Sequence, residues 1–583
     1  MPDDLAGAPK RRRGIPALKP EEPGLSAAST HDLTDDLRCE LERFYRQPSS
    51  NAAGLDVAGV FHPLAQVGVD DPSLFPLYLG PVDHAGAAEE AALEGVFSGL
   101  LAKAGLEPDP PVLALLVNKA RRLTDAHAAP VDARRVLSAA GRELANTEAS
   151  VAVATLLDAV PAGARLLSAS SQAPLHLLAQ AASRQDALSR EGHLENLQDL
   201  AARAARFLRG ERFGAQEARR VELGNVRRER LGHALNTLQE YLATREPLEP
   251  RWLVHDGLHA VTGLEGLSGD GHESWRVLVR ENPCAAAAGL FDREAEKCVE
   301  VAQAISRLEL ETAGVFETAR HEAWLAAMGW EDLKASERQQ LPLVVTLTSA
   351  DQIARRGMAA LSQLLRSGRP VQVVLTADPL QPMDGEPDGG RFEPLLFGLI
   401  HRRAVVQQSA LAYPWHLARG IDRALDARRP GLHIVALGDL HQVQAAVAGR
   451  GHPLAFHDPD AGRGWVERLD LSGNPAHRDD WPSHGSDQGP AKDNLAMTFA
   501  DAVLLDRGWS GHFQVVPDQL EDGLIPLAIA LARGEREAGV PFIWCGVGDR
   551  PCRVAISRQL FIACRERLEI WRALQEMAGL RGR

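Results

Sequence analysis

The chain of 583 residues has few cysteines, and their positions disfavour several kinds of disulfide-held or metal-held fold. The six cysteines are scattered, at Cys39, Cys284, Cys298, Cys545, Cys552 and Cys564. A small secreted domain held by disulfides concentrates its cysteines in a short length. Because no two of the six form a C-x-x-C pair, a zinc ribbon and a self-contained ferredoxin cluster are also disfavoured.

The sequence also lacks long hydrophobic runs and an excess of positive charge. No apolar segment approaches the roughly 20 residues that cross a bilayer, and no signal peptide is recognisable. Lys and Arg number 64 against 78 Asp and Glu, so the formal charge of −14 argues against nucleic-acid binding. With 45% hydrophobic and 24% charged residues, we expect a globular cytoplasmic protein.

Short catalytic signatures are missing as well. The sequence contains no G-x-S-x-G, no Walker A loop and no H-E-x-x-H, and nothing in it nominates a Ser/His/Asp triad. His255 and His259 have the four-residue spacing of a metal-binding pair on a helix. Gly257 lies between them and weakens a helix, and no third ligand is evident. We therefore interpret both as turn or core histidines.

Composition divides the chain into four parts. Residues 1–30 are rich in Pro, Gly and charge and have no apolar period, which predicts a disordered tail. Residues 31–245 carry Ala, Leu, Arg and Glu at helical spacing, and we expect a mainly helical region, with helices that include residues 174–182, 194–208 and 217–241. We expect an α/β domain over residues 246–475 and a C-terminal extension over residues 476–583. An amphipathic pattern over residues 552–577 predicts a long final helix.

Apolar, β-branched runs alternate with helical patterns inside the expected α/β domain. The runs that we predict to be strands are residues 343–347, 371–376, 404–409 and 432–437. We predict a helix over residues 353–366, with Ser349 as its cap and Gln352 completing a capping box, and a second helix over residues 414–427. Such alternation with short connections is typical of a parallel, doubly wound sheet with right-handed crossovers. Because ligands of these sheets gather at the carboxyl ends of the strands, we expect the site there.

Three segments of this domain occur in the order and near-spacing of a known family. They are GMAAL with LRSGRPVQVVL at residues 357–375, AVVQQS to RPGLHIV at residues 404–435, and AVAGRGHPLAFHDP at residues 446–459. Together they resemble the thiamine-diphosphate-binding domain of pyruvate:ferredoxin oxidoreductases and related 2-oxoacid oxidoreductases. The likeness covers about residues 250–475 and rests on collinearity. It implies a parallel, doubly wound fold of the thiamine-diphosphate-binding type.

The resemblance also implies a site for thiamine diphosphate and Mg²⁺. In the family, an Asp of a Gly-Asp-Gly turn binds the metal, and a hydroxyl and a carbonyl from the next strand-end loop help complete the shell. Counted from Ser367, the family Asp falls on Ala350, with Asp351 one residue later. The family hydroxyl falls on Asp378, and the family carbonyl falls on Leu380. The candidate metal ligands are Asp351 and Asp378, and the candidate cofactor-binding residues are Ser349, Asp351, Asp378, Leu380 and Gly385.

This sequence departs from the family pattern at several positions. Ala350 supplies no ligand, and Met383 replaces an amide with a thioether that Mg²⁺ binds poorly. Asp351 also suits the first turn of a helix, and Asp378, which precedes a proline, suits a turn. The two regions that correspond to the family's cluster ligands contain no cysteine. We therefore expect no iron–sulfur cluster in this chain.

Three functions remain open at this point. The first is a degenerate homologue of the thiamine-diphosphate domain that acts as a subunit or scaffold of an oxidoreductase-type complex. The second is a working 2-oxoacid oxidoreductase subunit whose iron–sulfur cluster lies on a partner. The third is an unrelated helical interaction protein with a Rossmann-like domain, because doubly wound sheets serve many functions. In each case we expect other protein subunits or further copies of this chain as partners, and neither nucleic acid nor membrane.

Overall fold

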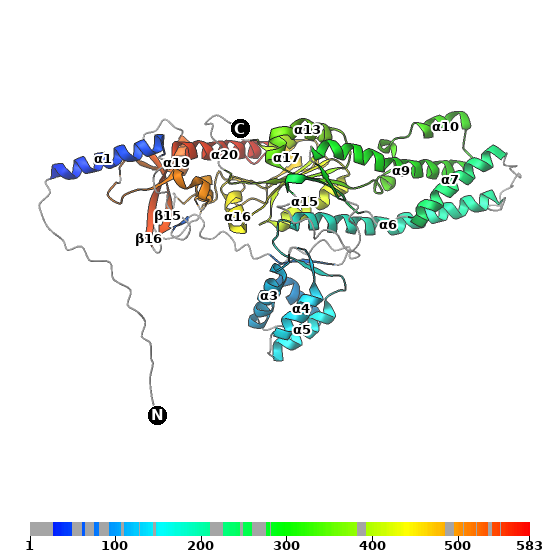
Figure 1. Cartoon of the computed structure of the whole chain (residues 1–583), viewed down its shortest axis with the longest axis horizontal. Helices are drawn as coiled ribbons and strands as arrows, with labels where there is room; N and C mark the ends of the chain where they lie inside the picture. The colour runs from blue at the N-terminus through cyan, green and yellow to red at the C-terminus, as the bar shows by residue number, and fades with distance from the viewer. Residues whose placement is uncertain are drawn as a thin grey trace, which may run out of the picture.

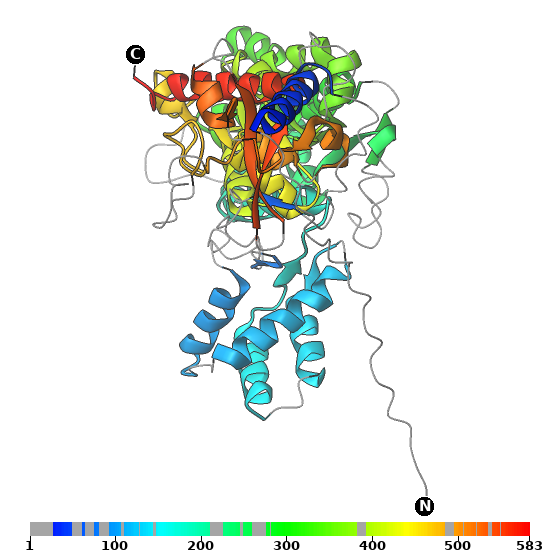
Figure 2. The ribbon, with the colours of Figure 1, turned by 90° about the vertical axis from the view of Figure 1, so that its left-hand side faces the viewer.

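The computed structural model is an elongated molecule built around one large sheet (Figure 1). A helical lobe, a helical arm and a smaller C-terminal sheet extend from this centre (Figures 1 and 2). The residues that the structure describes are 27–48, 61–63, 75–80, 92–106, 110–127, 129–143, 147–209, 225–244, 249–258, 276–279, 282–381, 392–483, 495–504, 506–520, 522–533, 539–547 and 550–582.

The large sheet has eight strands in the order β12-β11-β9-β10-β8-β7-β5-β6. Their bounds are β5 Arg251–His255, β6 Arg276–Val279, β7 Val344–Ser349, β8 Gln372–Ala377, β9 Val405–Ala410, β10 Gly431–Ala436, β11 Ala455–His457 and β12 Leu469–Asp470. The strands from β9 to β6 pair in parallel, whereas β11 runs antiparallel to both β9 and β12.

The four predicted strands are confirmed as β7, β8, β9 and β10, and they pair with one another in parallel. Their side chains are almost all buried, as expected of strands with both faces covered. The other strands of the sheet were not predicted. In β5, a run of only three apolar residues lies between Arg251 and His255, and β11 and β12 are too short to give a periodic signal.

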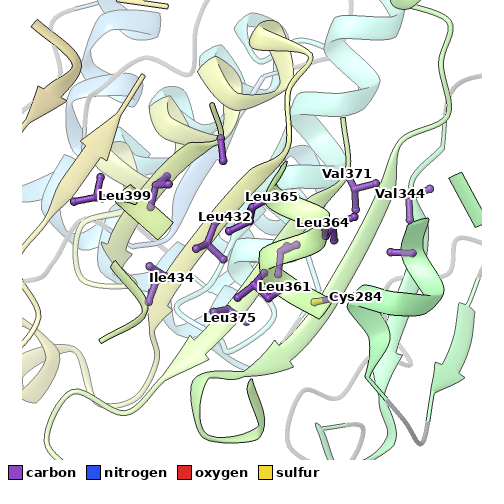
Figure 3. Packing of buried hydrophobic residues seen from close by; sticks show 14 of the residues in the cluster. Cys284, Val344, Leu361, Leu364, Leu365, Val371, Leu375, Leu399, Leu432 and Ile434 are labelled. Atoms are coloured by element: carbon purple, nitrogen blue, oxygen red, sulfur yellow. The ribbon is translucent and has the colours of Figure 1, made fainter. Parts of the chain in front are cut away.

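Helices cover both faces of the sheet, so the expected α/β layering is confirmed. On one face, α9 (Pro283–Thr312), α13 (Met358–Arg366) and α14 (Pro394–Leu399) pack on a core that includes Val373 and Leu375. Figure 3 shows the α13 leucines directed at Leu375 and Leu432 of the strands. On the opposite face, α6 (Ala173–Leu208) and α15 (Pro414–Ala427) pack on a core that includes Val374.

The helix after β7 differs from the prediction of one regular helix over residues 353–366. It consists of α12 (Ala350–Gln352), a π-helical segment Ile353–Gly357 and α13. At the π segment, the backbone of Gly357 lies close to Asn282, and a Cβ at Gly357 would come within 2.9 Å of Asn282 Nδ2. Single π turns within helices often occur at functional sites. The second predicted helix is confirmed as α15.

The helical arm contains the second half of α6, α7 (Asn225–Thr244), the second half of α9, and α10 (Thr318–Ala326). We predicted separate helices over residues 174–182 and 194–208, but α6 is a single helix of 36 residues. Its first part packs on the sheet and its last part packs in the arm core. The polar stretch between these two parts is helical as well. It marks the place where α6 leaves the sheet and enters the arm.

The helical lobe comprises α2 (Leu93–Lys103), α3 (Pro110–Asp125), α4 (Ala133–Glu143) and α5 (Thr147–Ala159) around one core. The described part of residues 86–245 is mostly helical, as predicted. The lobe also has a small sheet in the order β2-β4-β3, with bounds Leu77–Leu79, Arg165–Leu167 and Val131–Asp132. Strands of two or three residues leave no recognisable sequence pattern.

The C-terminal sheet is built mainly from the hairpin β15 (Val540–Val547) and β16 (Arg550–Ile556). Its other strands are β1 Phe61–Pro63, β13 Phe513–Val515 and β14 Leu524–Pro526. The helix α1 (Ala27–Arg46) packs against it through Leu41 and Phe44. This helix begins inside the predicted tail, and residues 1–26 lie outside the described residues. The N-terminal elements α1 and β1 thus belong with the C-terminal extension in space.

The predicted final helix is confirmed as α20 (Arg558–Met577). It starts later than predicted because residues 550–556 form β16. Its first half packs with α18 (Phe499–Val503) and α19 (Leu527–Arg533), while Trp571 and Leu574 enter the core of the large sheet. The helix therefore joins two cores of the same chain. Among the described helices, none is long and apolar enough to cross a membrane.

Candidate functional site at the carboxyl edge of the large sheet

The strand order identifies the crevice where a ligand of this sheet would be expected. In chain order, the sequence passes from β5 outward to β6 and then returns to β7 on the other side of β5. The next strand, β8, continues away from β5. In doubly wound sheets, the crevice outside the carboxyl ends of the two strands at such a reversal is the usual binding place. Here these ends are His255 of β5 and Ser349 of β7.

Ser349 and Asp378 follow neighbouring strands and lie at the same edge of the sheet. In the β7–β8 ladder, Ser349 lies opposite Thr376, and Asp378 comes two residues after Thr376. The structure therefore brings three of the sequence-predicted residues, Ser349, Asp351 and Asp378, to the same edge. Gly385 lies outside the described residues.

The side chain of Ser349 caps the start of the following helix. Its hydroxyl oxygen accepts a hydrogen bond from the backbone N–H of Gln352 at 3.2 Å, as expected of an N-cap serine. The Gln352 side chain does not bond back to Ser349. Instead its Oε1 accepts a bond from the Thr348 hydroxyl at 3.4 Å. The hydroxyl of Ser349, one of the candidate cofactor-binding residues, thus stabilises α12.

Asp351 and Asp378 are both exposed and take part in local contacts. Asp351 Oδ1 lies 3.1 Å from Arg355 Nε, one helical turn later. Asp378 Oδ1 accepts a hydrogen bond from the backbone N–H of Leu380 at 3.0 Å, which is an Asx turn. Within the described ranges, no group of three or more His, Cys, Asp or Glu side chains is arranged to hold a metal ion.

Leu380 lies where this edge contacts the C-terminal sheet and the helices packed on it, α18, α19 and the first half of α20. We call this group of elements the C-terminal unit. Its side chain is buried in a core with Phe499 and Trp509. Its carbonyl oxygen accepts a hydrogen bond of 2.6 Å from the indole Nε1 of Trp509, which is fully buried. The carbonyl that the resemblance assigns to the metal shell therefore faces an indole N–H of the C-terminal unit. Sequence reasoning missed this contact, because the two residues are 129 positions apart.

Further polar residues at the crevice were not nominated from the sequence. His255 Nδ1 accepts a hydrogen bond from the Gly257 backbone N–H at 3.1 Å. A Cβ at Gly257 would come within 3.0 Å of Gln352 Nε2, so the ends of β5 and β7 approach closely. Asn282 caps α9 through its bond from Cys284 N at 2.9 Å. His255 ends a strand, so it does not form a helical pair with His259, which lies outside the described residues.

A half-buried histidine and a fully buried serine lie at the end of β9, away from this crevice. His416 Nδ1 lies 2.9 Å from the Ser409 hydroxyl, and burial lowers the pKa of His416 to about 4. The Ser409 backbone oxygen also accepts a bond from His452 Nε2 at 2.8 Å. The Ser409 residue is completely buried, so substrate has no access to its hydroxyl. We assign this group a structural role that joins β9 to α15.

A charged groove of about 750 Å³ opens at the β12 edge of the large sheet. Its charged lining residues are Arg423, Asp426, Asp458, Asp460, Glu467, Arg468 and Asp470. One of these carboxylates is already neutralised, because Arg429 binds Asp460 through two hydrogen bonds of 2.6 and 2.7 Å. The groove is open and acidic, and it lies far along the sheet from the β5–β7 crevice.

Comparison with known proteins leaves the site to be judged on its own geometry. No protein-family model matches the chain, and no curated protein matches it significantly. The contacts above show how the local backbone and the C-terminal unit engage Ser349, Asp378 and Leu380.

Proposed function

We propose that this chain is a degenerate relative of the thiamine-diphosphate domain of 2-oxoacid oxidoreductases and acts as a subunit or scaffold of a protein complex. The observation that carries the proposal is the 2.6 Å hydrogen bond from Trp509 Nε1 to the Leu380 carbonyl. In a working site, this carbonyl would face a dication. Here it lies in an apolar core beside a hydrogen-bond donor, which offers a metal ion no vacant, solvated position.

The other candidate residues support the same proposal. Ser349 caps α12, Asp351 pairs with Arg355, and Asp378 closes a turn on Leu380. Each of these contacts is a common way to stabilise the start of a helix or a turn, and none requires a ligand. Ala350, at the family's metal-binding position, adds no oxygen atom. The contacts of these residues at the sheet edge are thus explained by the stabilisation of a helix start and a turn.

The scaffold role is supported by the parts that extend from the sheet. The arm of α6, α7 and α9 has its own apolar core, and so does the lobe of α2 to α5. Both project from the large sheet in Figure 1, and Figure 2 shows the lobe from a second side. Surfaces of this kind, held on a rigid α/β platform, suit the binding of other protein subunits or of further copies of the chain.

Calorimetric titration of the full-length protein with thiamine diphosphate and Mg²⁺ tests the proposal. We expect no saturable binding up to about 1 mM ligand, which is weaker than roughly −4 kcal/mol. The variants Asp351→Asn and Asp378→Asn, which keep the local hydrogen bonds, should give the same result. Asp439→Asn is the matched control, because Asp439 is an exposed helix cap at the same sheet edge.

A working cofactor site would give a different result. Micromolar, Mg²⁺-dependent binding that Asp378→Asn abolishes and Asp439→Asn leaves intact would overturn the proposal. It would assign the chain to the working 2-oxoacid oxidoreductases.

A further inference from the structure

Two cysteines lie directly opposite each other in the C-terminal sheet. In the antiparallel ladder of β15 and β16, Cys545 is the partner of Cys552. Residues that are directly opposed in an antiparallel pair project their side chains from the same face of the sheet. Cys545 is fully buried in the core that contains α18 and α20, and Cys552 is partly buried against the same core. The two thiols therefore share one side of the hairpin.

The hydrogen-bonding pattern of the ladder fixes the spacing of this pair. Next along the ladder, Gly546 lies opposite Pro551, which has no N–H and cannot complete a hydrogen-bonded pair. On the other side of β15, Cys545 lies opposite Pro63 of β1, which has no N–H either. Because hydrogen-bonded and non-hydrogen-bonded pairs alternate, Cys545 and Cys552 form a hydrogen-bonded pair.

The neighbouring strand agrees with this assignment. Val516 donates its N–H to the Arg553 carbonyl, so Arg553 directs its backbone groups toward β13. Successive residues of a strand direct their backbone groups to opposite sides, so Cys552, one residue earlier, directs its backbone N–H and C=O toward β15. Hydrogen-bonded pairs have their Cα atoms about 5.5 Å apart, which lies within the ~4.4–6.8 Å range of disulfides.

We propose that Cys545 and Cys552 are a redox modification site, at which a small-molecule disulfide oxidant converts the two thiols into a reversible cross-strand disulfide. This site is independent of the proposed function, because it lies in the C-terminal sheet and uses none of the residues of the sheet edge.

The reaction is an ordinary thiol–disulfide exchange. The more accessible Cys552 loses its proton, its sulfur attacks one sulfur of the oxidant, and the oxidant's S–S bond breaks to release one thiolate. Cys545 then loses its proton, attacks the Cys552 sulfur of the mixed disulfide and displaces the second thiolate. The two protons pass to the two released thiolates. The protein pair is oxidised by two electrons, and the oxidant is reduced to two thiols.

The surroundings of the pair make the exchange slow and reversible. Burial raises the pKa of Cys545, and the nearby Asp501 raises it further. Burial also raises the pKa of Cys552, with a contribution from Asp518. Thiolate is therefore scarce at neutral pH and the rate should rise with pH. Cys552 is only partly buried, so a thiol reductant can reach the disulfide and return both cysteines to thiols.

The test uses the full-length protein, first reduced and then incubated with oxidised glutathione at about pH 8.5, where an ordinary thiol is half ionised. We expect the intact mass to show one glutathione, on the exposed Cys39, together with the loss of two further hydrogen atoms. The thiols titrated after denaturation should fall from the six of the sequence to three. Peptide mapping should find Cys545 linked to Cys552. Dithiothreitol should restore the thiols.

Variants distinguish this pair from the other cysteines. Cys545→Ser should form no internal disulfide and should retain glutathione on Cys552. Cys298→Ser is the matched control, because Cys298 is also partly buried but donates to the Gln340 carbonyl, and its disulfide yield should be unchanged. The exposed Cys39 reports that the oxidant is active. Glutathione on Cys39 without the Cys545–Cys552 link, or a link from Cys545 to Cys564, would overturn the proposal.

Discussion

His433 is a fully buried histidine in β10, held between glutamines of the two adjacent strands. Its Nδ1 lies 2.8 Å from Gln407 Oε1 of β9, and its Nε2 lies 3.0 Å from Gln372 Oε1 of β8. The Gln407 amide in turn donates to the carbonyl of His416 at 2.8 Å, at the start of α15. Burial lowers the pKa of His433 to about 4, so the ring is neutral at pH 7 and its single N–H donates to one glutamine oxygen at a time. This network joins three strands and a helix through polar contacts inside the core.

The low pKa of His433 predicts a loss of stability in mild acid. Between pH 6.5 and about 4, the unfolded chain binds a proton at this position and the folded protein does not. The free energy of unfolding should therefore fall as the pH drops through this window, by up to about 3 kcal/mol from this one residue, and level off below it. Urea unfolding at a series of pH values measures the effect.

The variant His433→Gln isolates this contribution from other titrating groups. Asp501, for example, acts in the opposite direction, because burial raises its pKa to about 6. The variant should show a shallower decline between pH 6.5 and 4 than the wild type. The same substitution at the exposed His441 is the control and should leave the slope unchanged. Equal slopes in the wild type and His433→Gln would contradict the prediction.

At the scale of the element, the arm shows what a helical sequence pattern can and cannot predict. The apolar spacing identified α7 and the two ends of α6 as helical, because the 3.6-residue period is local. It did not show that the two ends of α6 belong to one helix. The buried Glu311 of α9 could not be predicted, because its partners belong to α7. Its carboxylate lies 2.5 Å from Arg227 Nε and 3.6 Å from Arg230 Nη2.

Removing this carboxylate should loosen the arm. Glu311 is completely buried, so Glu311→Ala removes the carboxylate that binds Arg227 and should cost about 3 kcal/mol. Arg230 keeps its ion pair with Glu322. Glu309→Ala, on the same helix, removes an exposed ion pair with Lys334 and should cost about 0.5 kcal/mol. Hydrogen exchange should become faster in residues 225–244 and 300–312 of Glu311→Ala and remain slow in β7 to β10. Equal protection of the arm in both variants would contradict this assignment.

At the scale of the whole molecule, α20 connects the C-terminal unit to the large sheet. Trp571 is fully buried, and its indole Nε1 donates to the Asp479 carbonyl at 2.8 Å. The guanidinium of Arg450 lies 4.1 Å from the centre of the Trp571 ring. Arg572 forms a two-point ion pair with Asp480. These contacts attach the second half of the helix to the segment that follows β12.

Trp571→Ala should uncouple the two cores. Loss of the buried ring should cost about 3–5 kcal/mol and leave Arg450 without its stacking partner. We expect thermal unfolding to separate into two transitions, with the C-terminal unit melting first. Glu569→Ala, whose side chain is 69% exposed, is the control on the same helix and should keep the wild-type profile. A single, uniformly lowered transition in Trp571→Ala would show that the two cores unfold as one.

The sequence by itself determined the features that depend on neighbouring residues. Four buried β-branched runs identified four parallel strands, and their alternation with helices identified the α/β layering. Ser349 was identified as a helix cap, and its position with Asp351 and Asp378 at one edge followed from parallel pairing.

Only the tertiary structure decided the features that depend on distant residues. It placed Trp509 on the Leu380 carbonyl, α1 on the C-terminal sheet, and Cys545 opposite Cys552. It also shows that β5 and β6 lie beside β7, so the expected crevice is at the carboxyl ends of β5 and β7, at His255 and Ser349. The physical reason is that hydrogen-bonding periods and capping preferences act within a few residues. Strand order, and the burial of a carbonyl by an indole 129 residues away, follow from the packing of the complete chain.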